Sequence, residues 1–251
     1  MNIIAIIPAR MGSSRFPGKP MKMLLHKPMI EHVYERVSKC DLLTKTIVAT
    51  CDNEIYDHIV SIDGEAIMTG NHHDRASDRC AEALDHIEKK DRIQYDIIVM
   101  VQGDEPMTHP DMITEAVSPM LQDPKIIVAN LLGEIKTIEE FEDRNCIKVV
   151  CDKQSNAIYF SREPIPTRSK STVIPMKKQV CIIPFTRKFL IEYTKLEPTP
   201  LEIVESIDMM RVLENGLKVK MVPTAHHTYP VDTAEDLKKV ENLILKKNNI
   251  F

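Results

Sequence analysis

Short apolar runs rich in β-branched residues alternate, in the first half of the chain, with longer stretches whose apolar residues recur at helical spacing. The runs predict strands at residues 3–7, 46–49, 66–68, 97–101 and 126–130. The stretches between them predict helices at residues 29–39, 54–61, 77–89 and 112–121. The first and fourth runs are continuously apolar, which is typical of strands buried on both faces. The alternation therefore indicates βαβ units and a mainly parallel sheet with helices on both faces.

The rhythm changes after about residue 145. Here the pattern predicts strands at residues 146–151, 157–160, 180–184 and 217–222, and helices at residues 187–193, 201–213 and 234–247. A polar stretch with three prolines and several basic residues, 162–178, interrupts this order. The last helix begins with Thr233-Ala234-Glu235-Asp236, a sequence similar to a capping box. We interpret the chain as one α/β domain, residues 1–251, in which about residues 155–185 form an excursion from the sheet, either a flap or a dimer contact.

Composition narrows the class of protein. With 251 residues, of which 43% are hydrophobic and 28% charged, the chain is typical of a globular protein. The formal net charge of −4 offers no basic excess for nucleic acid or an anionic membrane. No apolar run reaches the roughly 18 residues of a membrane-spanning helix, and no basic region precedes the apolar N-terminus, so no membrane segment or signal peptide is expected. The six cysteines lack C-x-x-C spacing, which favours reduced thiols in a cytoplasmic protein.

Two of only seven glycines stand in a cationic loop directly after the first predicted strand. Arg10, Gly12, Arg15, Gly18 and Lys19 all fall within this loop. Ligands of open α/β sheets bind beyond the carboxyl ends of the strands, and a glycine-bearing cationic loop there suits a polyphosphate. The spacing fits neither the P-loop nor the G-x-G-x-x-G motif. A solvated basic loop is the alternative.

A second candidate loop, Gln102-Gly103-Asp104-Glu105-Pro106, follows the strand predicted at residues 97–101. A carboxylate at this edge, beside a phosphate loop, is well placed to hold Mg²⁺, which takes carboxylate and phosphate oxygens. An ordinary turn is the alternative, since glycine, aspartate and proline all favour turns. The combination of the two loops favours the magnesium interpretation.

The two loops belong to an ordered set of motifs. The set comprises Ile7-Pro8-Ala9-Arg10 with the rest of the first loop, Lys27-Pro28-Met29-Ile30, Val101-Gln102-Gly103-Asp104-Glu105-Pro106, Ile158-Tyr159-Phe160-Ser161-Arg162 with Ile165-Pro166, Pro200-Leu201-Glu202, and Val231-Asp232-Thr233-Ala234-Glu235-Asp236-Leu237. It spans nearly the whole chain and resembles the CMP-Kdo synthetase (3-deoxy-manno-octulosonate cytidylyltransferase) family. The resemblance implies a three-layer α/β nucleotidyltransferase-type fold with a mainly parallel, mixed central sheet and the inserted excursion.

The resemblance also implies a reaction, in which an acceptor hydroxyl attacks the α-phosphorus of CTP and pyrophosphate leaves. Catalysis of this kind is mostly positioning and charge neutralisation. The matching residues are Arg10, Arg15 and Lys19 for the phosphates, and Asp104 and Asp232 for Mg²⁺, with Arg10, Lys19 and Asp104 as the catalytic candidates. For Asp232 the residues alone favour another interpretation, an acid placed at a helix start by the macrodipole.

Further nucleotide-binding and acceptor-binding residues follow from the resemblance. The additional nucleotide candidates are Ala9, Ser13, Arg75, Asp78, Arg79 and Gln102. Arg75 and Arg79 are four residues apart and can share one helix face, although a solvated helix has the same pattern. The acceptor candidates are Tyr159, Arg162, Gln179 and Glu202. The implied partners are CTP and a small acidic acceptor, and the implied assembly is a homodimer.

Three segments depart from the family pattern. Ala76 stands where the family has glycine, Cys181 replaces the glycine of a Gly-Ile-Tyr strand, and Met209 stands where a sugar-binding glutamine is expected. Because these changes fall mainly on the acceptor side, an amino-deoxy analogue, another acidic sugar or a smaller hydroxylated or phosphonate compound is a second candidate acceptor. A non-catalytic nucleotide-binding paralogue is a third hypothesis, which the presence of the phosphate and metal residues disfavours.

Two features have no role in this scheme. The pairs His72-His73 and His226-His227 lack the spacing of a zinc motif, and neighbouring side chains in extended backbone point to opposite faces. We therefore expect no zinc site. His226 or His227 lines the acceptor pocket or lies in a surface loop. The basic stretch 162–178, with Arg168, Lys170, Lys177 and Lys178, either closes over an anionic acceptor or is a solvated flap.

Overall fold

The computed structural model of the chain describes residues 1–12, 15–169 and 176–248. Its contacts divide the chain into two compact units, one comprising Met1–Ile113 with Thr228–Phe251 and the other Thr114–His227. The single domain expected from the sequence stays a prediction. Within the described residues, no helix combines the length and the apolar character needed to cross a membrane. The six cysteines, all in the described part of the chain, are free thiols.

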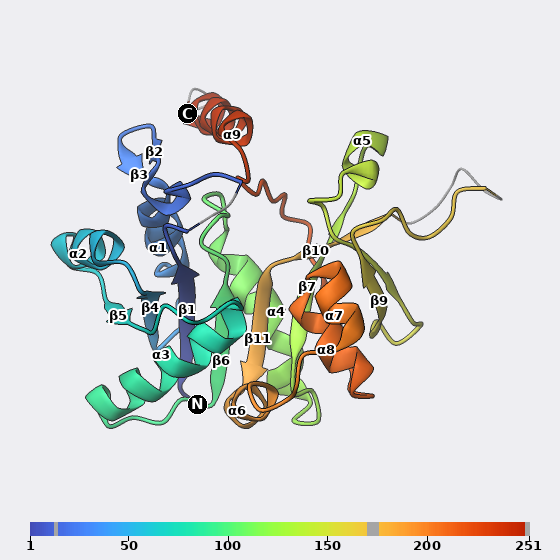
Figure 1. Cartoon of the computed structure of the whole chain (residues 1–251), viewed down its shortest axis with the longest axis horizontal. Helices are drawn as coiled ribbons and strands as arrows, with labels where there is room; N and C mark the ends of the chain where they lie inside the picture. Colours follow the sequence, from blue (N-terminus) through green and yellow to red (C-terminus); the bar gives the residue numbers. More distant parts are fainter. Residues whose placement is uncertain (13–14, 170–175, 249–251) are drawn as a thin grey trace. The chain divides into compact units, whose positions relative to one another are not determined.

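The first unit is built on a parallel sheet. Its strands are β1 (Ile3–Ala9), β4 (Lys45–Thr50), β5 (Ala66–Met68) and β6 (Ile97–Val101), in the order β6-β1-β4-β5. Figure 1 shows β1 between β4 and β6, and both pairings are parallel. Every residue of β1 and β6 is buried, so both faces of these strands are covered, as their continuously apolar sequences predict.

Helices and short elements complete this unit. They are η1 (Lys19–Met21), β2 (Met23–Leu24), β3 (Lys27–Pro28), α1 (Met29–Val37), α2 (Asn53–Ser61), α3 (Ala76–Asp91) and α9 (Ala234–Asn248), while α4 (Pro110–Gln122) begins in it. Helix α1 buries Ile30, Val33 and Val37, three of the positions in the predicted helical pattern. The C-terminal helix α9 contributes Val240 and Ile244 to a core cluster that also contains Leu24, Met29, Met107 and Val231.

The second unit holds a mixed sheet. Its strands are β7 (Ala129–Glu134), β8 (Lys148–Cys151), β9 (Ala157–Ser161), β10 (Lys177–Val180), β11 (Ile182–Thr186) and β12 (Lys220–Pro223). Five of them form a sheet in the order β12-β7-β10-β8-β9, in which β12 is parallel to β7 and β10 is antiparallel to both neighbours. Its helices are α5 (Ile138–Glu142), α6 (Arg187–Tyr193), α7 (Pro200–Glu205) and α8 (Asp208–Glu214). The mixed α/β architecture confirms the predicted fold class.

Several predicted elements of the second unit were wrong in their bounds. The helix predicted at residues 201–213 is two helices, because Ser206 adopts a left-handed conformation with φ of 53°. The strand predicted at residues 180–184 is likewise two strands, separated at Cys181. The strand predicted at residues 126–130 instead begins at Ala129. Helix α5 and the β2–β3 ladder were not predicted, because segments of two to five residues carry too little periodicity.

Candidate active site

The loop after β1 folds back on itself. The Gly18 N–H donates to the Met11 carbonyl at 3.0 Å, and the Met11 N–H donates to Asp52 Oδ2 at 2.8 Å, which ties the loop to the segment after β4. Gly18 has φ of +70°, a left-handed conformation that glycine adopts without steric cost. Directly after this turn, Lys19 opens the short helix η1. The turn therefore determines the position of the Lys19 backbone at the start of η1.

Lys19 lies between two carboxylates from distant parts of the chain. Its Nζ is 2.9 Å from Asp104 Oδ2 and 3.1 Å from Asp232 Oδ1. Arg15 adds a second cation, with Nη2 3.0 Å from the same oxygen of Asp232. The first loop, the Asp104 loop and the segment before α9 thus meet at one cluster of two acids and two cations, all within the first unit.

Backbone packing brings the two aspartates together. A Cβ on Gly103 would lie 3.2 Å from the Pro8 carbonyl oxygen and 3.3 Å from Ile30 Cδ1, so only a glycine lets this loop approach β1 and α1 so closely without a shift. The Asp104 carbonyl in turn accepts the Val231 N–H at 3.0 Å. Because Val231 belongs to the core cluster that α9 shares with Leu24 and Met29, packing of the C-terminal helix places Asp232 beside Lys19.

The start of α9 shows that Asp232 is not its cap. The Asp236 N–H donates to Thr233 Oγ1 at 3.2 Å, and the Thr233 N–H donates to Asp236 Oδ2 at 3.0 Å. This reciprocal pair is the predicted capping box, with aspartate in the third position. The carboxylate of Asp232 is directed instead to Lys19 and Arg15. Asp232 directly precedes the Thr233 cap, where the helix macrodipole also favours an acid, so the helix-start and metal interpretations both stay predictions.

The cluster keeps Lys19 charged. Burial by itself would lower the pKa of the Lys19 ammonium, but the charges and hydrogen bonds of Asp104 and Asp232 outweigh burial and raise it. Asp104 Oδ2 and Asp232 Oδ1 lie 2.9 and 3.1 Å from the same atom, Lys19 Nζ. The distance between the two oxygens is therefore at most the sum of these two distances. Two carboxylates that converge on one cationic centre are the oxygen donors that a hard divalent cation prefers.

Other nucleotide candidates lie at the same edge of the sheet. Ala9 is the buried last residue of β1, and Gln102 directly follows β6, its parallel neighbour. Arg10 Nη1 donates to the carbonyl of His73 at 3.3 Å, so it is oriented by the loop that precedes α3. Ser13 lies outside the described residues.

The three candidates around the start of α3 have different environments. Arg75 is the residue that precedes the helix and Asp78 lies in its first turn. Arg79 is only 3% exposed, so it is not the solvated helix residue that its spacing equally allowed. Its Nη1 donates to Thr69 Oγ1 and to the Gly70 carbonyl, whereas Nη2 has no hydrogen-bond partner among the described residues. Arg79 therefore has a buried N–H donor, at Nη2, close to the residues Thr69 and Gly70 that follow β5.

In the second unit, two acceptor candidates converge on Glu205, a residue that the sequence analysis did not select. The Tyr159 hydroxyl donates to Glu205 Oε1 at 3.2 Å and the Arg162 N–H donates to Glu205 Oε2 at 2.8 Å. The Arg162 guanidinium donates to the carbonyls of Arg144, Glu205 and Ser206. The position of Arg162 is thus fixed by the turn between α7 and α8.

The other two acceptor candidates are hydrogen-bonded within the unit. Gln179 Nε2 donates to Asn130 Oδ1 at 2.6 Å. Glu202 is fully buried, and its two oxygens accept from Arg211 Nη2 and Nε, each at 2.6 Å. It also completes a capping box with Thr199 at the start of α7. These contacts give Glu202 a structural role, and the acceptor roles of all four residues stay predictions.

The remaining polar features also have partners in the second unit. His227 Nε2 lies 2.9 Å from Lys136 Nζ, and His226 Nε2 lies 3.8 Å from Glu115 Oε1. Lys177 and Lys178 pair with Glu134 and Glu140. Lys170 lies outside the described residues. The two interpretations of the basic stretch 162–178 both stay open.

Residues 4–220 match the family model described as cytidylyltransferase. A 3-deoxy-manno-octulosonate cytidylyltransferase of Fusobacterium nucleatum is 42% identical over 250 residues, covering 100% of this chain and 99% of that protein. One of Geobacter sulfurreducens is 41% identical over 251 residues, covering 96% and 98%.

A solved structure that is similar in both fold and sequence supports the same family. It is a CMP:2-keto-3-deoxy-manno-octonic acid synthetase complexed with CTP, which aligns with a TM-score of 0.89 and 34% identity over 98% of this chain and 100% of the other. The ordered motifs, the α/β architecture and the matches over nearly the whole chain agree. The chain belongs to the cytidylyltransferase family, within the group of 3-deoxy-manno-octulosonate cytidylyltransferases.

Proposed function

We propose that the chain transfers CMP from CTP to a hydroxyl of 3-deoxy-manno-octulosonate (Kdo) and releases pyrophosphate, with Mg²⁺ as cofactor. The observation that carries this proposal is the meeting of Asp104, Asp232, Lys19 and Arg15 in one cluster within a member of this family. In the reaction, a bond forms between the acceptor oxygen and the α-phosphorus, the bond between the α-phosphorus and the bridging oxygen breaks, and the acceptor proton passes to solvent.

The residues present fit a divalent cation. Asp104 and Asp232 would hold Mg²⁺, because their oxygens converge on one centre and Mg²⁺ binds through one or two carboxylates together with substrate phosphates. Bound Mg²⁺ would supply charge neutralisation and favour the ionised form of the acceptor hydroxyl. Lys19 pairs with both carboxylates and Arg15 pairs with Asp232, so both cations are within a side chain's reach of a phosphate held there.

The chain's own cations have distinct tasks in this proposal. Lys19, 13% exposed, offers a charge at a fixed position, and such preorganised charge stabilises developing negative charge at little reorganisation cost. Arg15, 50% exposed, is the more solvent-accessible of the two cations and would contact the outer phosphates. Arg10, in the loop after β1, is oriented by the His73 carbonyl, and Arg79, in the first turns of α3, offers its buried donor, so both would support nucleotide binding.

Kdo is the preferred acceptor among those considered. Relatives at 41–42% identity over nearly the whole chain carry the name of the Kdo enzyme, which favours Kdo over the other acceptors and over a non-catalytic role. Met209, the departure expected to remove a sugar contact, is fully buried in α8. Arg162 is the proposed partner of the acceptor carboxylate, as the resemblance implies, and the carbonyls of Glu205 and Ser206 orient its guanidinium. A homodimer, as in the resemblance, is part of the proposal.

A substrate panel tests the proposal. Pyrophosphate release would be followed with Mg²⁺, four nucleoside triphosphates and a set of acceptors that includes Kdo, its amino-deoxy analogue and a hydroxylated phosphonate. We expect release with CTP and Kdo at a rate well above every other combination. Faster release with another acceptor would overturn the choice of Kdo, whereas release that does not depend on CTP would overturn the nucleotide assignment.

A further inference from the structure

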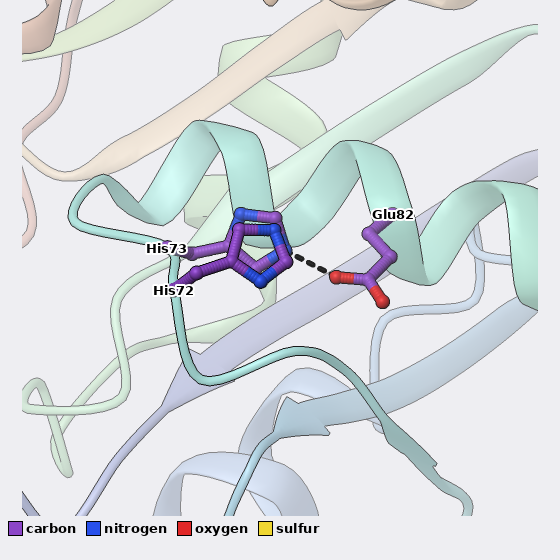
Figure 2. Close-up of side chains that lie close together, drawn as sticks. All are labelled: His72, His73 and Glu82. Atoms are coloured by element: carbon purple, nitrogen blue, oxygen red, sulfur yellow. Dashed lines mark hydrogen bonds and ion pairs between the residues drawn. The ribbon is translucent and has the colours of Figure 1, made fainter.

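Three side chains with metal-binding atoms gather where the loop after β5 enters α3. His72 and His73 come from the loop, and Glu82 comes from the helix (Figure 2). His73 Nε2 is hydrogen-bonded to Glu82 Oε2, and the two imidazole rings lie with centroids 4.2 Å apart. One ligand atom from each residue lies within 4.8 Å of the other two. The expectation that the adjacent histidines point to opposite faces is therefore wrong here.

Gly70 explains how the two rings gather. A Cβ at this position would lie 2.4 Å from Cε1 and Nδ1 of His72, so any larger residue would displace the imidazole. The Gly70 N–H also donates to both oxygens of Glu82, at 3.1 and 3.0 Å. One glycine thus makes room for the His72 ring and orients the carboxylate.

We propose that His72, His73 and Glu82 bind a divalent transition-metal ion, with Zn²⁺ as the ion whose preferred ligands they match. Two imidazole nitrogens and one carboxylate oxygen form a three-residue donor set of the kind that binds Zn²⁺ and leaves a fourth position for water. The set differs from the oxygen-only cluster of Asp104 and Asp232, which suits Mg²⁺.

The geometry requires only a small adjustment. Zinc–ligand bonds of about 2.0–2.2 Å in a tetrahedral site place the ligand atoms roughly 3.3 Å apart. The ligand atoms of the three residues already lie within 4.8 Å of one another, and the His73–Glu82 pair is in hydrogen-bond contact. His72 is exposed, so its ring can turn toward the other two without disturbing the core.

The surroundings also support the ligands. Metal-binding side chains are usually oriented by an outer hydrogen-bond partner, and the Gly70 N–H serves Glu82 in this way. His73 Nε2 and the Gly70 N–H both contact the carboxylate of Glu82, so its orientation is set from two sides. His86 adds a third imidazole nearby, with Nε2 3.8 Å from Glu82 Oε1.

Calorimetric titration of the untagged full chain with ZnCl₂, without nucleotide, tests the site. We expect one Zn²⁺ bound per chain and, with Co²⁺ as a second probe, visible absorption bands from nitrogen and oxygen ligation. His72→Ala and Glu82→Gln should each weaken binding by at least the ~10- to 100-fold that loss of an outer-shell partner costs. His26→Ala, an exposed histidine of the same unit outside the cluster, is the matched control and should bind like the parent chain.

Two results would overturn the proposal. One is the absence of Zn²⁺ binding by the parent chain at millimolar concentration. The other is equal affinity in the parent chain and in His72→Ala, which would place the ion elsewhere. Because His72 is exposed, its variant should melt like the parent chain without metal, and this comparison separates loss of a ligand from loss of folding. Failure of this site leaves the magnesium cluster untouched, since Asp104 and Asp232 are not among its residues.

Discussion

Neutralising Asp232 is the sharpest perturbation of the proposed catalytic cluster. Asp232→Asn keeps the shape of the side chain but removes the charge that faces Lys19 and Arg15. Asp232 is 14% exposed and Lys19 is 13% exposed, so their interaction lies between an exposed pair, worth about 0.2–1 kcal/mol, and a buried one, whose disruption costs about 3–5 kcal/mol. Lys19 keeps Asp104 as a partner at 2.9 Å, and we therefore expect a loss of only about 1–2 kcal/mol in unfolding free energy.

The effect on turnover should be much larger than the effect on stability. If Asp232 holds Mg²⁺, its loss removes several kcal/mol of transition-state stabilisation, and about 3 kcal/mol corresponds to a rate decrease of roughly 100-fold. The assay is pyrophosphate release at saturating CTP and Kdo over a range of Mg²⁺ concentrations. The half-saturating Mg²⁺ concentration should rise in the variant, which a purely structural role for Asp232 would not produce.

A matched control separates this effect from a general change of charge. Asp85→Asn removes an exposed carboxylate of α3 that pairs with Lys89. Because α3 carries none of the four residues of the catalytic cluster, this change should leave turnover and the Mg²⁺ requirement unchanged. Turnover of Asp232→Asn within about threefold of the parent chain, at the same half-saturating Mg²⁺ concentration, would refute the metal assignment.

Three further predictions concern the stability of the fold. Glu202→Gln leaves the buried Arg211 without the carboxylate that pairs with it, so we expect the free energy of unfolding in urea to fall by about 3–5 kcal/mol. The double variant Glu202→Met/Arg211→Met should recover much of this loss, whereas an unchanged unfolding midpoint for the single variant would contradict the prediction. Gly18→Ala forces a left-handed conformation on alanine and should lower the free energy of unfolding by about 1–2 kcal/mol. A Cβ at Gly12 meets no described atom within 4 Å, so Gly12→Ala should change the free energy of unfolding by no more than about 0.5 kcal/mol. Equal shifts of the two variants in thermal melts would argue against a strained turn at Gly18. Burial by itself would raise the pKa of Asp91, but Lys45 and the Tyr95 hydroxyl outweigh burial and lower this pKa below 3.8. The contribution of Asp91 to stability is therefore present above pH 3.8 and is lost as the pH falls through the pKa of the folded state. The difference in unfolding free energy between the parent chain and Asp91→Asn should be constant from pH 7 to about 5 and shrink below about 4.

The main strands and helices of the first unit could be predicted because their buried positions coincide with apolar residues at strand or helix spacing. Two continuously apolar runs became β1 and β6, and the helical spacing of Ile30, Val33 and Val37 became the buried face of α1. The break at Ser206 could not be predicted in the same way. A left-handed serine has no distinctive sequence signal, and the apolar spacing continues across it.

The candidate site was predicted only in part from the residues themselves. The cations of the first loop and Asp104 follow strands that share one sheet edge, so topology alone places them together. Asp232 is different, because its place beside Lys19 depends on packing of α9 against Leu24 and Met29, a contact more than 200 residues apart in sequence. The adjacent histidines were visible in the sequence, but Glu82 could not be assigned to them, because it comes from α3 and the histidines come from the loop before it.

Direct detection of the product tests the proposed transfer of CMP from CTP to Kdo most simply. The purified chain would be incubated with CTP, Kdo and Mg²⁺, and the mixture analysed by mass spectrometry and by ³¹P nuclear magnetic resonance. We expect a species with the mass of CMP joined to Kdo, with a single phosphodiester resonance, together with an equal amount of pyrophosphate, and neither product after chelation of the metal. Cytidine diphosphate with inorganic phosphate, or unchanged CTP, would contradict it.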